Sequence, residues 1–180
     1  MTTAPDFWVF GYGSLVFNPG MEIAETRRAT VQGYRRRFCM WSIHHRGSEA
    51  DPGLVLALEP HDGATCTGLA MRPADPEPAL AALRERELIS SAYHETTVPL
   101  VTDDGASLES LAYVIDVTHR QYVSDLTLEQ QARIIAQAQG GRGPNHEYLT
   151  HSVEGLAKLG VRDPELDWLV ARVQQMRAAS

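Results

Sequence analysis

From Phe7 to Leu15 the chain reads FWVFGYGSL. Residues 7–10 are aromatic or β-branched, which is typical of a short buried strand. Two glycines and a serine follow directly, and glycine lets the backbone turn sharply and lets another molecule approach it closely. We therefore expect a strand that ends in a tight turn, whose N–H groups could hold a carboxylate or an oxyanion. A plain hairpin turn is the alternative, and the glycine pattern by itself favours it.

The sequence beyond this turn predicts several more strands. Gly33 lies inside the first of them and predicts a bulge. The sequence His-Asp-Gly at residues 61–63 predicts a turn between the second and the third. A hairpin is expected around Asp-Asp-Gly at residues 103–105. The expected strands are, in order, residues 27–42, 54–58, 66–71, 98–101 and 111–117.

Capping residues predict where the helices begin. Asp75, which precedes a proline, opens the first expected helix. Thr127 with Gln130 fits a capping box, in which each residue's side chain binds the other's backbone. Asn145 and Asp163 are the expected N-caps of the last two helices. Strands, one helix, more strands and then helices indicate an α+β fold, not a regularly alternating βαβ sheet.

Size and charge exclude several kinds of partner. At 180 residues the chain is expected to form a single domain over residues 1–180. Its net charge of −7 argues against nucleic acid and against an anionic membrane surface. No apolar run approaches the roughly 18 to 20 residues of a membrane span, and Met1–Asp6 lacks the basic start of a secretory signal. Cys39 and Cys66 show no paired spacing, so we expect reduced thiols in the cytoplasm. The acidic surface and the lack of an obvious heptad favour a monomer.

Glu87 is the carboxylate that departs from its helix pattern. Positions 80 and 87 lie within about 20° of each other on a helix, so Glu87 shares a stripe with Leu80 and Leu83. Glu85 falls roughly 140° from Leu80 and is expected to face solvent. An acid on the apolar side is either part of a buried structural pair or a functional group. Burial would raise its pKa and make it a better proton shuttle, and the spacing alone leaves both interpretations open.

Other catalytic chemistry has little support in the sequence. The seven histidines are scattered, without HExxH or HxH spacing, so we expect no metal site. Ser14 follows a strand, but the turn lacks the GxSxG pattern of a serine hydrolase. Ser14 is therefore expected to supply a backbone N–H and not a nucleophile.

Taken together, these residues resemble the ChaC-like γ-glutamylcyclotransferases. The resemblance rests on Phe10–Leu15 followed by Asn18-Pro19, on Arg86-Glu87 and on Tyr93. It extends from about residue 7 to residue 170. Further matching segments are the histidine-arginine-glycine loop at residues 42–48, the proline-glycine strand entry at 52–55 and the glycine-rich helix start at 140–149. Departures from the family pattern concern the substrate more than the reaction; they are Phe17, His44 and Leu54.

The resemblance implies a mixed barrel-like β-sheet with flanking helices. It also implies cleavage of γ-glutamyl peptides, glutathione above all, into 5-oxoproline and a product such as cysteinylglycine, without metal or cofactor. The substrate's own α-amino group would attack its γ-carbonyl, with Glu87 as general base and then general acid. The small-molecule substrate would be contacted by Tyr12, Gly13, Ser14, Leu15, Arg46, Tyr93 and Tyr148.

Other functions stay open at this point. The same cyclisation could act on γ-glutamyl amines or γ-glutamyl amino acids. A non-catalytic γ-glutamyl-binding module belongs to another class of protein, and such a binder would need neither Glu87 nor an oxyanion turn. A metal-dependent hydrolase would be indicated if activity vanished with a chelator and returned with zinc.

Overall fold

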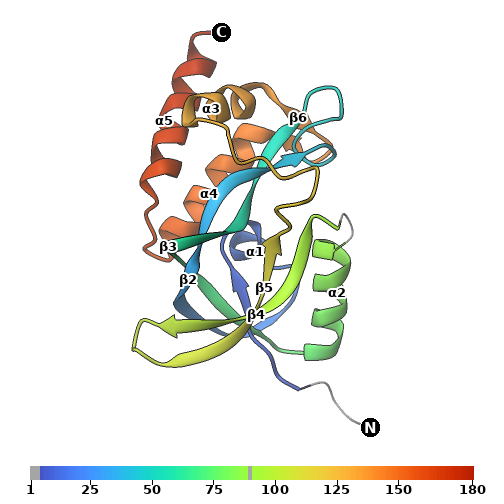
Figure 1. Ribbon diagram of the computed structural model, residues 1–180, viewed down its shortest axis with the longest axis vertical. Helices are drawn as coiled ribbons and strands as arrows, with labels where there is room; N and C mark the ends of the chain where they lie inside the picture. Colours follow the sequence, from blue (N-terminus) through green and yellow to red (C-terminus); the bar gives the residue numbers. More distant parts are fainter. Residues whose placement is uncertain (1–4, 89–90) are drawn as a thin grey trace. The chain divides into compact units, whose positions relative to one another are not determined.

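The computed structural model describes residues 5–88 and 91–180. Its strands are β1 (Val9–Gly11), β2 (Ile23–Ser42), β3 (Gly53–Pro73), β4 (Tyr93–Thr102), β5 (Ser107–Ile115), β6 (Gln139–Gly140) and β7 (Gly143–Pro144) (Figure 1). Its helices are α1 (Ser14–Phe17), α2 (Pro76–Leu88), α3 (Leu128–Gln137), α4 (Asn145–Lys158) and α5 (Pro164–Ala178).

The chain forms two compact units. The first unit holds the chain up to Arg36 together with Leu58–His119, and the second holds Arg37–Ala57 and Arg120–Ser180. The long strands β2 and β3 each have residues in both units. Each unit is therefore made from two separate stretches of chain.

Five strands of the described chain close into a barrel, in the order β1-β3-β2-β4-β5. β1 pairs antiparallel with β3, where Val9 lies opposite Met71, and parallel with β5. β4 and β5 form an antiparallel hairpin, in which Tyr93 lies opposite Ile115. Helix α2 lies beside β4 (Figure 1). Parallel and antiparallel pairs meet in one closed sheet, which confirms the predicted mixed barrel-like fold with flanking helices.

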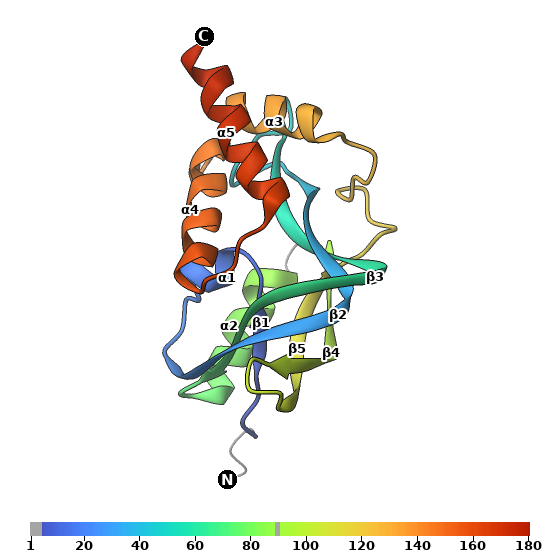
Figure 2. The ribbon, with the colours of Figure 1, turned by 90° about the vertical axis from the view of Figure 1, so that its left-hand side faces the viewer.

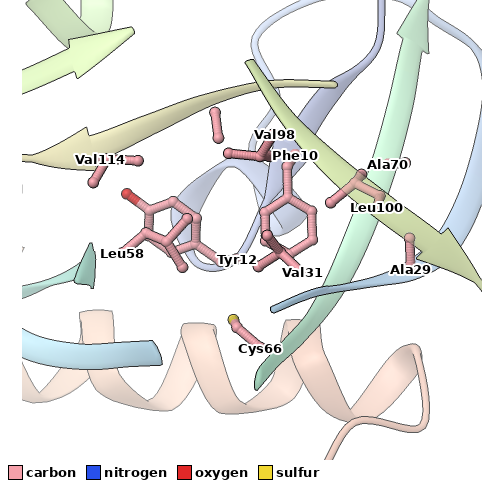
Figure 3. Close-up of a cluster of buried hydrophobic side chains, with 11 residues drawn as sticks. Phe10, Tyr12, Ala29, Val31, Leu58, Cys66, Ala70, Val98, Leu100 and Val114 are labelled. Carbon is pink, nitrogen blue, oxygen red and sulfur yellow. The ribbon is translucent and has the colours of Figure 1, made fainter. Parts of the chain in front are cut away.

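A cluster of buried side chains fills the barrel (Figure 3). Phe10 and Tyr12 bring two aromatic rings into it from the end of β1, and their centroids are 6.4 Å apart. Burial of these rings explains why the chain is apolar just before the turn at residues 11–14, which we call the glycine turn. The buried rings also fix the point where this turn begins. The cluster consists of Phe10, Tyr12, Ala29, Val31, Leu58, Cys66, Ala70, Val98, Leu100, Ala112 and Val114.

β1 and β3 approach each other closely at two glycines. A Cβ atom on Gly68 would lie 2.3 Å from the carbonyl oxygen of Gly11, well inside van der Waals contact. That oxygen belongs to the backbone and cannot rotate away as a side chain would. The first glycine of the FWVFGYGSL motif therefore lies where two strands come too close together for a side chain on β3.

A second cluster attaches the two helices of the first unit to the barrel. Leu15 from α1 and Leu83 from α2 pack with Val9, Met71 and Tyr113. Burying one leucine side chain stabilises a protein by roughly 1.5–3 kcal/mol. The glycine turn and helix α2 are thus held by the same small group of apolar side chains.

The second unit contains three helices that pack on one another, α3, α4 and α5 (Figure 2). Thr127 caps α3 through the predicted capping box: its hydroxyl accepts from the Gln130 N–H, and the Gln130 side chain accepts from the Thr127 N–H. Asp163 caps α5, because its carboxylate accepts from the Glu165 N–H and the Leu166 N–H. Both helix starts confirm the sequence prediction.

The prediction that Asn145 caps α4 is wrong. Asn145 is the first helical residue, Pro144 holds the N-cap position, and the Asn145 side chain is fully buried. Its amide oxygen accepts from the Leu54 N–H at 2.8 Å, and its amide nitrogen donates to the Leu54 carbonyl at 2.8 Å. The side chain therefore pairs with the N–H and the carbonyl of Leu54 in β3, as a neighbouring strand would. It is engaged there and does not cap the helix.

Two strand predictions also need correction. The turn expected at residues 61–63 is part of β3, which runs without a break from Gly53 to Pro73. Gly63 has φ +81° there, and because glycine adopts a positive φ at little cost, the strand continues through it. The strand expected from residue 27 begins at Ile23, and Gly33 within it has φ +85°, in keeping with the expected bulge position.

Candidate active site

The glycine turn leads directly into α1, a short helix that the sequence did not predict. The Val16 N–H donates to the Gly13 carbonyl at 3.0 Å, and the Asn18 N–H donates to the Ser14 carbonyl at 2.8 Å. The first N–H groups of a helix have no acceptor within that helix. Ser14 and Leu15 therefore present the N–H groups that an oxyanion or a carboxylate could use.

The side chains of this turn hold it in place. Tyr12 is buried, and its hydroxyl donates to the Tyr113 carbonyl at 3.1 Å. Leu15 is 5% exposed and lies in the apolar cluster under α1. The buried Arg36 guanidinium donates to the Tyr12 carbonyl at 3.1 Å and to the Thr67 carbonyl at 3.0 Å. The side chains of Tyr12 and Leu15 are therefore engaged in packing, and contact of either residue with a substrate stays a prediction.

Glu87 lies in the last turn of α2, and its side chain is only 12% exposed. Glu85 is exposed, as the helical spacing predicted. Burial raises the pKa of Glu87, and the Arg86 guanidinium, whose Nε lies 3.6 Å from Glu87 Oε1, offsets part of that rise. A carboxyl group with a raised pKa is suited to take up and return a proton near neutral pH.

Arg86 of α2 makes hydrogen bonds to the glycine turn and to the residue that follows α1. Its Nη2 donates to the Ser14 hydroxyl at 3.2 Å, and its Nη1 donates to the Asn18 carbonyl at 2.6 Å. Sequence reasoning gave this residue no role of its own. The one available signal was the alternation Arg-Glu-Arg-Glu over residues 84–87, which placed an arginine directly beside the acid.

Two tyrosines of the β4–β5 hairpin belong to the same apolar cluster. Tyr93 is partly buried and packs against the cluster that contains Leu83 and Tyr113. The Tyr113 hydroxyl donates to Glu95 Oε1 at 3.0 Å, and burial, with Glu95 and Glu87 nearby, raises the pKa of Tyr113. Sequence reasoning missed Tyr113, although it is the residue with a polar tip in an otherwise apolar run.

Arg46 and Tyr148 lie in the second unit and contact each other. The Arg46 guanidinium lies 5.6 Å from the centroid of the Tyr148 ring, and its Nη1 donates to the Pro144 carbonyl at 3.2 Å. Burial lowers the pKa of Arg46 from its ordinary value. The Tyr148 hydroxyl accepts from the Leu56 N–H at 3.0 Å. Both side chains thus take part in holding this unit together, and their contact with a substrate stays a prediction.

The histidine-arginine-glycine loop and the glycine-rich segment meet in the second unit. The Gly141 N–H donates to the His44 carbonyl at 2.7 Å, and the Arg142 N–H donates to the His45 carbonyl at 2.9 Å. A Cβ atom on Gly140 would lie 2.5 Å from the Gly47 nitrogen. Two motifs about a hundred residues apart in the sequence are therefore packed backbone to backbone.

Within residues 5–88 and 91–180, no group of three or more histidine, cysteine, aspartate or glutamate residues is arranged to hold a metal ion. Over the same described residues, no helix has the length and apolar character needed to cross a membrane.

Comparison with known proteins adds a family and a fold. A family model described as ChaC-like protein matches residues 7–176. A glutathione-specific gamma-glutamylcyclotransferase from Escherichia coli (strain K12) is 36% identical over 173 residues, which cover 95% of this chain and 74% of that protein. Glutathione-specific gamma-glutamylcyclotransferase 1 from Homo sapiens is 34% identical over 176 residues, which cover 94% and 79% respectively.

A solved structure is also similar over almost the whole chain. It is a yeast γ-glutamyl cyclotransferase specific to glutathione, and it matches with a TM-score of 0.88. The match covers 98% of this chain and 99% of the yeast chain, at 22% sequence identity. At that identity the likeness shows a shared fold.

Proposed function

Because the chain belongs to the ChaC-like protein family, we propose that it is a γ-glutamylcyclotransferase that cleaves glutathione into 5-oxoproline and cysteinylglycine. The relatives from Escherichia coli and Homo sapiens carry this activity in their names and align with more than nine-tenths of the chain. The observation that supports the reaction most directly is the buried Glu87 carboxyl group, because an intramolecular cyclisation needs a proton shuttle.

The reaction would need no nucleophile from the protein. The α-amino group of the γ-glutamyl residue attacks its own γ-carbonyl carbon and closes a five-membered ring, so the reacting atoms are already in one molecule. The bond between that carbon and the cysteine nitrogen then breaks. The products are 5-oxoproline and an amine, and no water is consumed.

Glu87 would serve this reaction twice. The α-amino group arrives as an ammonium, and the Glu87 carboxylate removes a proton from it so that the nitrogen can attack. The protonated Glu87 then gives that proton to the departing cysteine nitrogen. The ring nitrogen sheds a second proton as it becomes the lactam nitrogen, and the same amine takes it up and leaves as an ammonium. The raised pKa supports this role, because a carboxyl group that is too acidic would return the proton poorly.

The glycine turn would stabilise the negative charge that develops on the γ-carbonyl oxygen. The N–H groups of Gly13, Ser14 and Leu15 follow one another at the start of α1, and such groups bind an oxyanion without having to reorganise. The hydroxyl of Tyr93 belongs to the same unit as this turn. We assign Tyr93 to fixing the rest of the small-molecule substrate. Contact of Arg46 and Tyr148 with the substrate, which the family resemblance implies, stays a prediction.

The remaining sequence expectations are kept as part of this proposal. They are a single domain over residues 1–180, a monomer that acts in the cytoplasm without metal or cofactor, and no nucleic-acid or membrane partner. The net charge of −7 supports the last of these.

The test is an incubation of the purified protein with glutathione, with and without EDTA, followed by mass spectrometry. We expect 5-oxoproline and cysteinylglycine in equal amounts, independent of EDTA. Glu87→Gln keeps the shape of the side chain but removes the proton shuttle, so we expect kcat to fall about 10²- to 10⁴-fold. Glu85→Gln is the matched control on the exposed side of the same helix, and we expect it to react like the wild type.

Three results would change the proposal. Product from γ-glutamyl amines or dipeptides but not from glutathione would point to the alternative substrates. Silence of the folded wild type on all of these compounds would leave a binding module. A wild-type rate in Glu87→Gln would mean that another group moves the proton.

A further inference from the structure

One guanidinium group contacts both parts of the candidate active site. Arg86 binds the first residue of α1 through the Ser14 hydroxyl and the residue after α1 through the Asn18 carbonyl. Its Nη1 would also lie 3.5 Å from a Cβ atom on Gly20. On its other side, its Nε lies 3.6 Å from the Glu87 carboxylate. The side chain is 26% exposed, so it is partly enclosed by these partners.

We propose that Arg86 is a positioning residue that holds the Tyr12–Leu15 turn and the Glu87 carboxylate at a fixed position relative to each other. The inference rests on the proposed function, since it concerns the residues that would bind the oxyanion and move the proton. A four-residue helix is too short to be stable by itself, so its placement depends on contacts made by its ends. Arg86 supplies a contact at each end.

The geometry of the guanidinium group explains why an arginine is present. Its planar fork directs several N–H donors at fixed angles, so it can bind a hydroxyl, a carbonyl and a carboxylate together. Lysine would keep the positive charge but would present a single ammonium. The two contributions of Arg86, charge and shape, can therefore be separated by substitution.

The charge of Arg86 acts on Glu87 from the same helix. Arg86 lowers the pKa of Glu87 against the larger effect of burial. Five other titratable groups lie on β4 and β5: Tyr93, His94 and Glu95 on β4, and Glu109 and Tyr113 on β5. His94 and Glu109 are exposed, whereas Tyr93 and Tyr113 belong to the cluster that contains Leu83 of α2. Glu95 is already hydrogen-bonded, by Tyr113 and by another arginine of α2. Removing Arg86 therefore leaves Glu87 without the cation that faces it.

The experiment compares Arg86→Lys, Arg86→Gln and the wild type over a range of pH. For Arg86→Lys we expect kcat to fall about 10- to 100-fold, the size of effect that a small misplacement of reacting groups produces, with the acid limb of the pH profile close to that of the wild type. For Arg86→Gln we expect a similar loss and an acid limb displaced to higher pH. A residue with a structural role alone would lower the active fraction without moving this limb.

Arg84→Gln is the matched control. It removes the same charge from the same helix, but Arg84 binds Glu95, with contacts of 3.1 and 3.0 Å, and not Glu87. We expect its acid limb to stay at the wild-type pH. An equal displacement in Arg84→Gln and Arg86→Gln would reduce the effect to net charge and overturn the inference. So would a wild-type kcat in both Arg86 variants.

A second measurement does not depend on activity. The carboxyl resonance of Glu87, in protein labelled with ¹³C at the glutamate side chains, is identified by its absence from Glu87→Gln and is then titrated. We expect it to titrate at higher pH in Arg86→Gln than in the wild type, and an unchanged titration would overturn the inference. If the wild type cleaves no γ-glutamyl compound, the proposed function fails, while this titration still decides whether Arg86 governs Glu87.

Discussion

The two units of this protein differ in how their buried polar residues, Glu87 and Asn145, are compensated. In the first unit, burial of Glu87 raises its pKa, and Arg86 compensates only in part. In the second unit, the buried Asn145 makes two hydrogen bonds to one residue of β3. A buried charge that is not fully compensated costs stability, whereas a satisfied polar group does not. Under the proposed function, the pattern-breaking residue of the first unit serves chemistry, whereas that of the second unit serves packing.

The largest effect should come from the glycine contacts of the second unit. In Gly47→Ala the new Cβ would lie 2.0 Å from the Gly53 nitrogen and 2.5 Å from the Ser42 carbonyl oxygen. Both are backbone atoms, so the loop itself must move. We expect the free energy of unfolding, measured by chemical denaturation, to fall by about 3 kcal/mol or more.

Gly141→Ala is the control for that substitution. Its Cβ would lie 3.3 Å from the His44 carbonyl oxygen, a contact that a small shift relieves. We expect a loss below about 1 kcal/mol, in line with a modest overpacking cost. If Gly47→Ala were as stable as Gly141→Ala, the close packing of these loops would not be what holds the second unit together.

A smaller effect is expected from Tyr148→Phe, which keeps the ring beside Arg46 but removes the hydroxyl. The Leu56 N–H then loses the acceptor that lies 3.0 Å away in a buried position. Removing one partner of a buried hydrogen bond costs about 1–3 kcal/mol, and we expect thermal or chemical unfolding to show a loss of this size. Unchanged stability would show that this hydroxyl is not needed for packing and would weaken the contrast between the units.

Tyr12→Phe likewise removes a single tyrosine hydroxyl, in this case from the first unit. The Tyr12 hydroxyl is a donor to the Tyr113 carbonyl, and a carbonyl has a second lone pair and lies within the β4–β5 pairing. We therefore expect Tyr12→Phe to lose about 1 kcal/mol or less. If Tyr12→Phe lost more free energy of unfolding than Tyr148→Phe, the hydroxyl of the first unit would matter more for packing than that of the second, against the expected contrast.

The sequence predicted features that depend on neighbours close in the chain. The start of α3 at Thr127 and that of α5 at Asp163 depend on side chains that bind backbone groups two or three residues away. The exposure of Glu85 and the burial of Glu87 follow from helical spacing alone. The barrel-like fold came from resemblance to a family, because strand pairing joins residues that local patterns do not relate.

Features that depend on distant contacts escaped prediction. Asn145 was interpreted as a helix cap, but its partner is Leu54, ninety-one residues away. The turn expected at residues 61–63 had the right composition, yet Gly63 accommodates a positive φ inside a continuous strand. Arg86 gained significance only when the structure placed Ser14 and Asn18 against it. For Asn145 and Arg86 a partner remote in sequence decides what the residue does, whereas for Gly63 the backbone conformation decides it.

The smallest expected effect tests whether Glu87 costs the first unit stability. Because the folded protein raises the pKa of this carboxyl group above its ordinary value of 4.5, the folded state binds the proton more tightly than the unfolded state does. The contribution of Glu87 to the free energy of unfolding should therefore decline as the pH rises from that ordinary value through the raised one. Glu87→Gln lacks this contribution, so its stability relative to the wild type should grow as the pH rises above 4.5.

Denaturation curves at several pH values measure that advantage, and Glu85→Gln corrects for the lost charge because it lies on the exposed face of the same helix. Parallel curves for Glu87→Gln and the wild type would mean that the folded state accommodates the carboxylate without cost, and the contrast between the units would fail. A variant that gains stability at high pH while it loses product formation would instead show one carboxyl group opposing folding and supporting the reaction. Only a group kept for its chemistry is expected to do both.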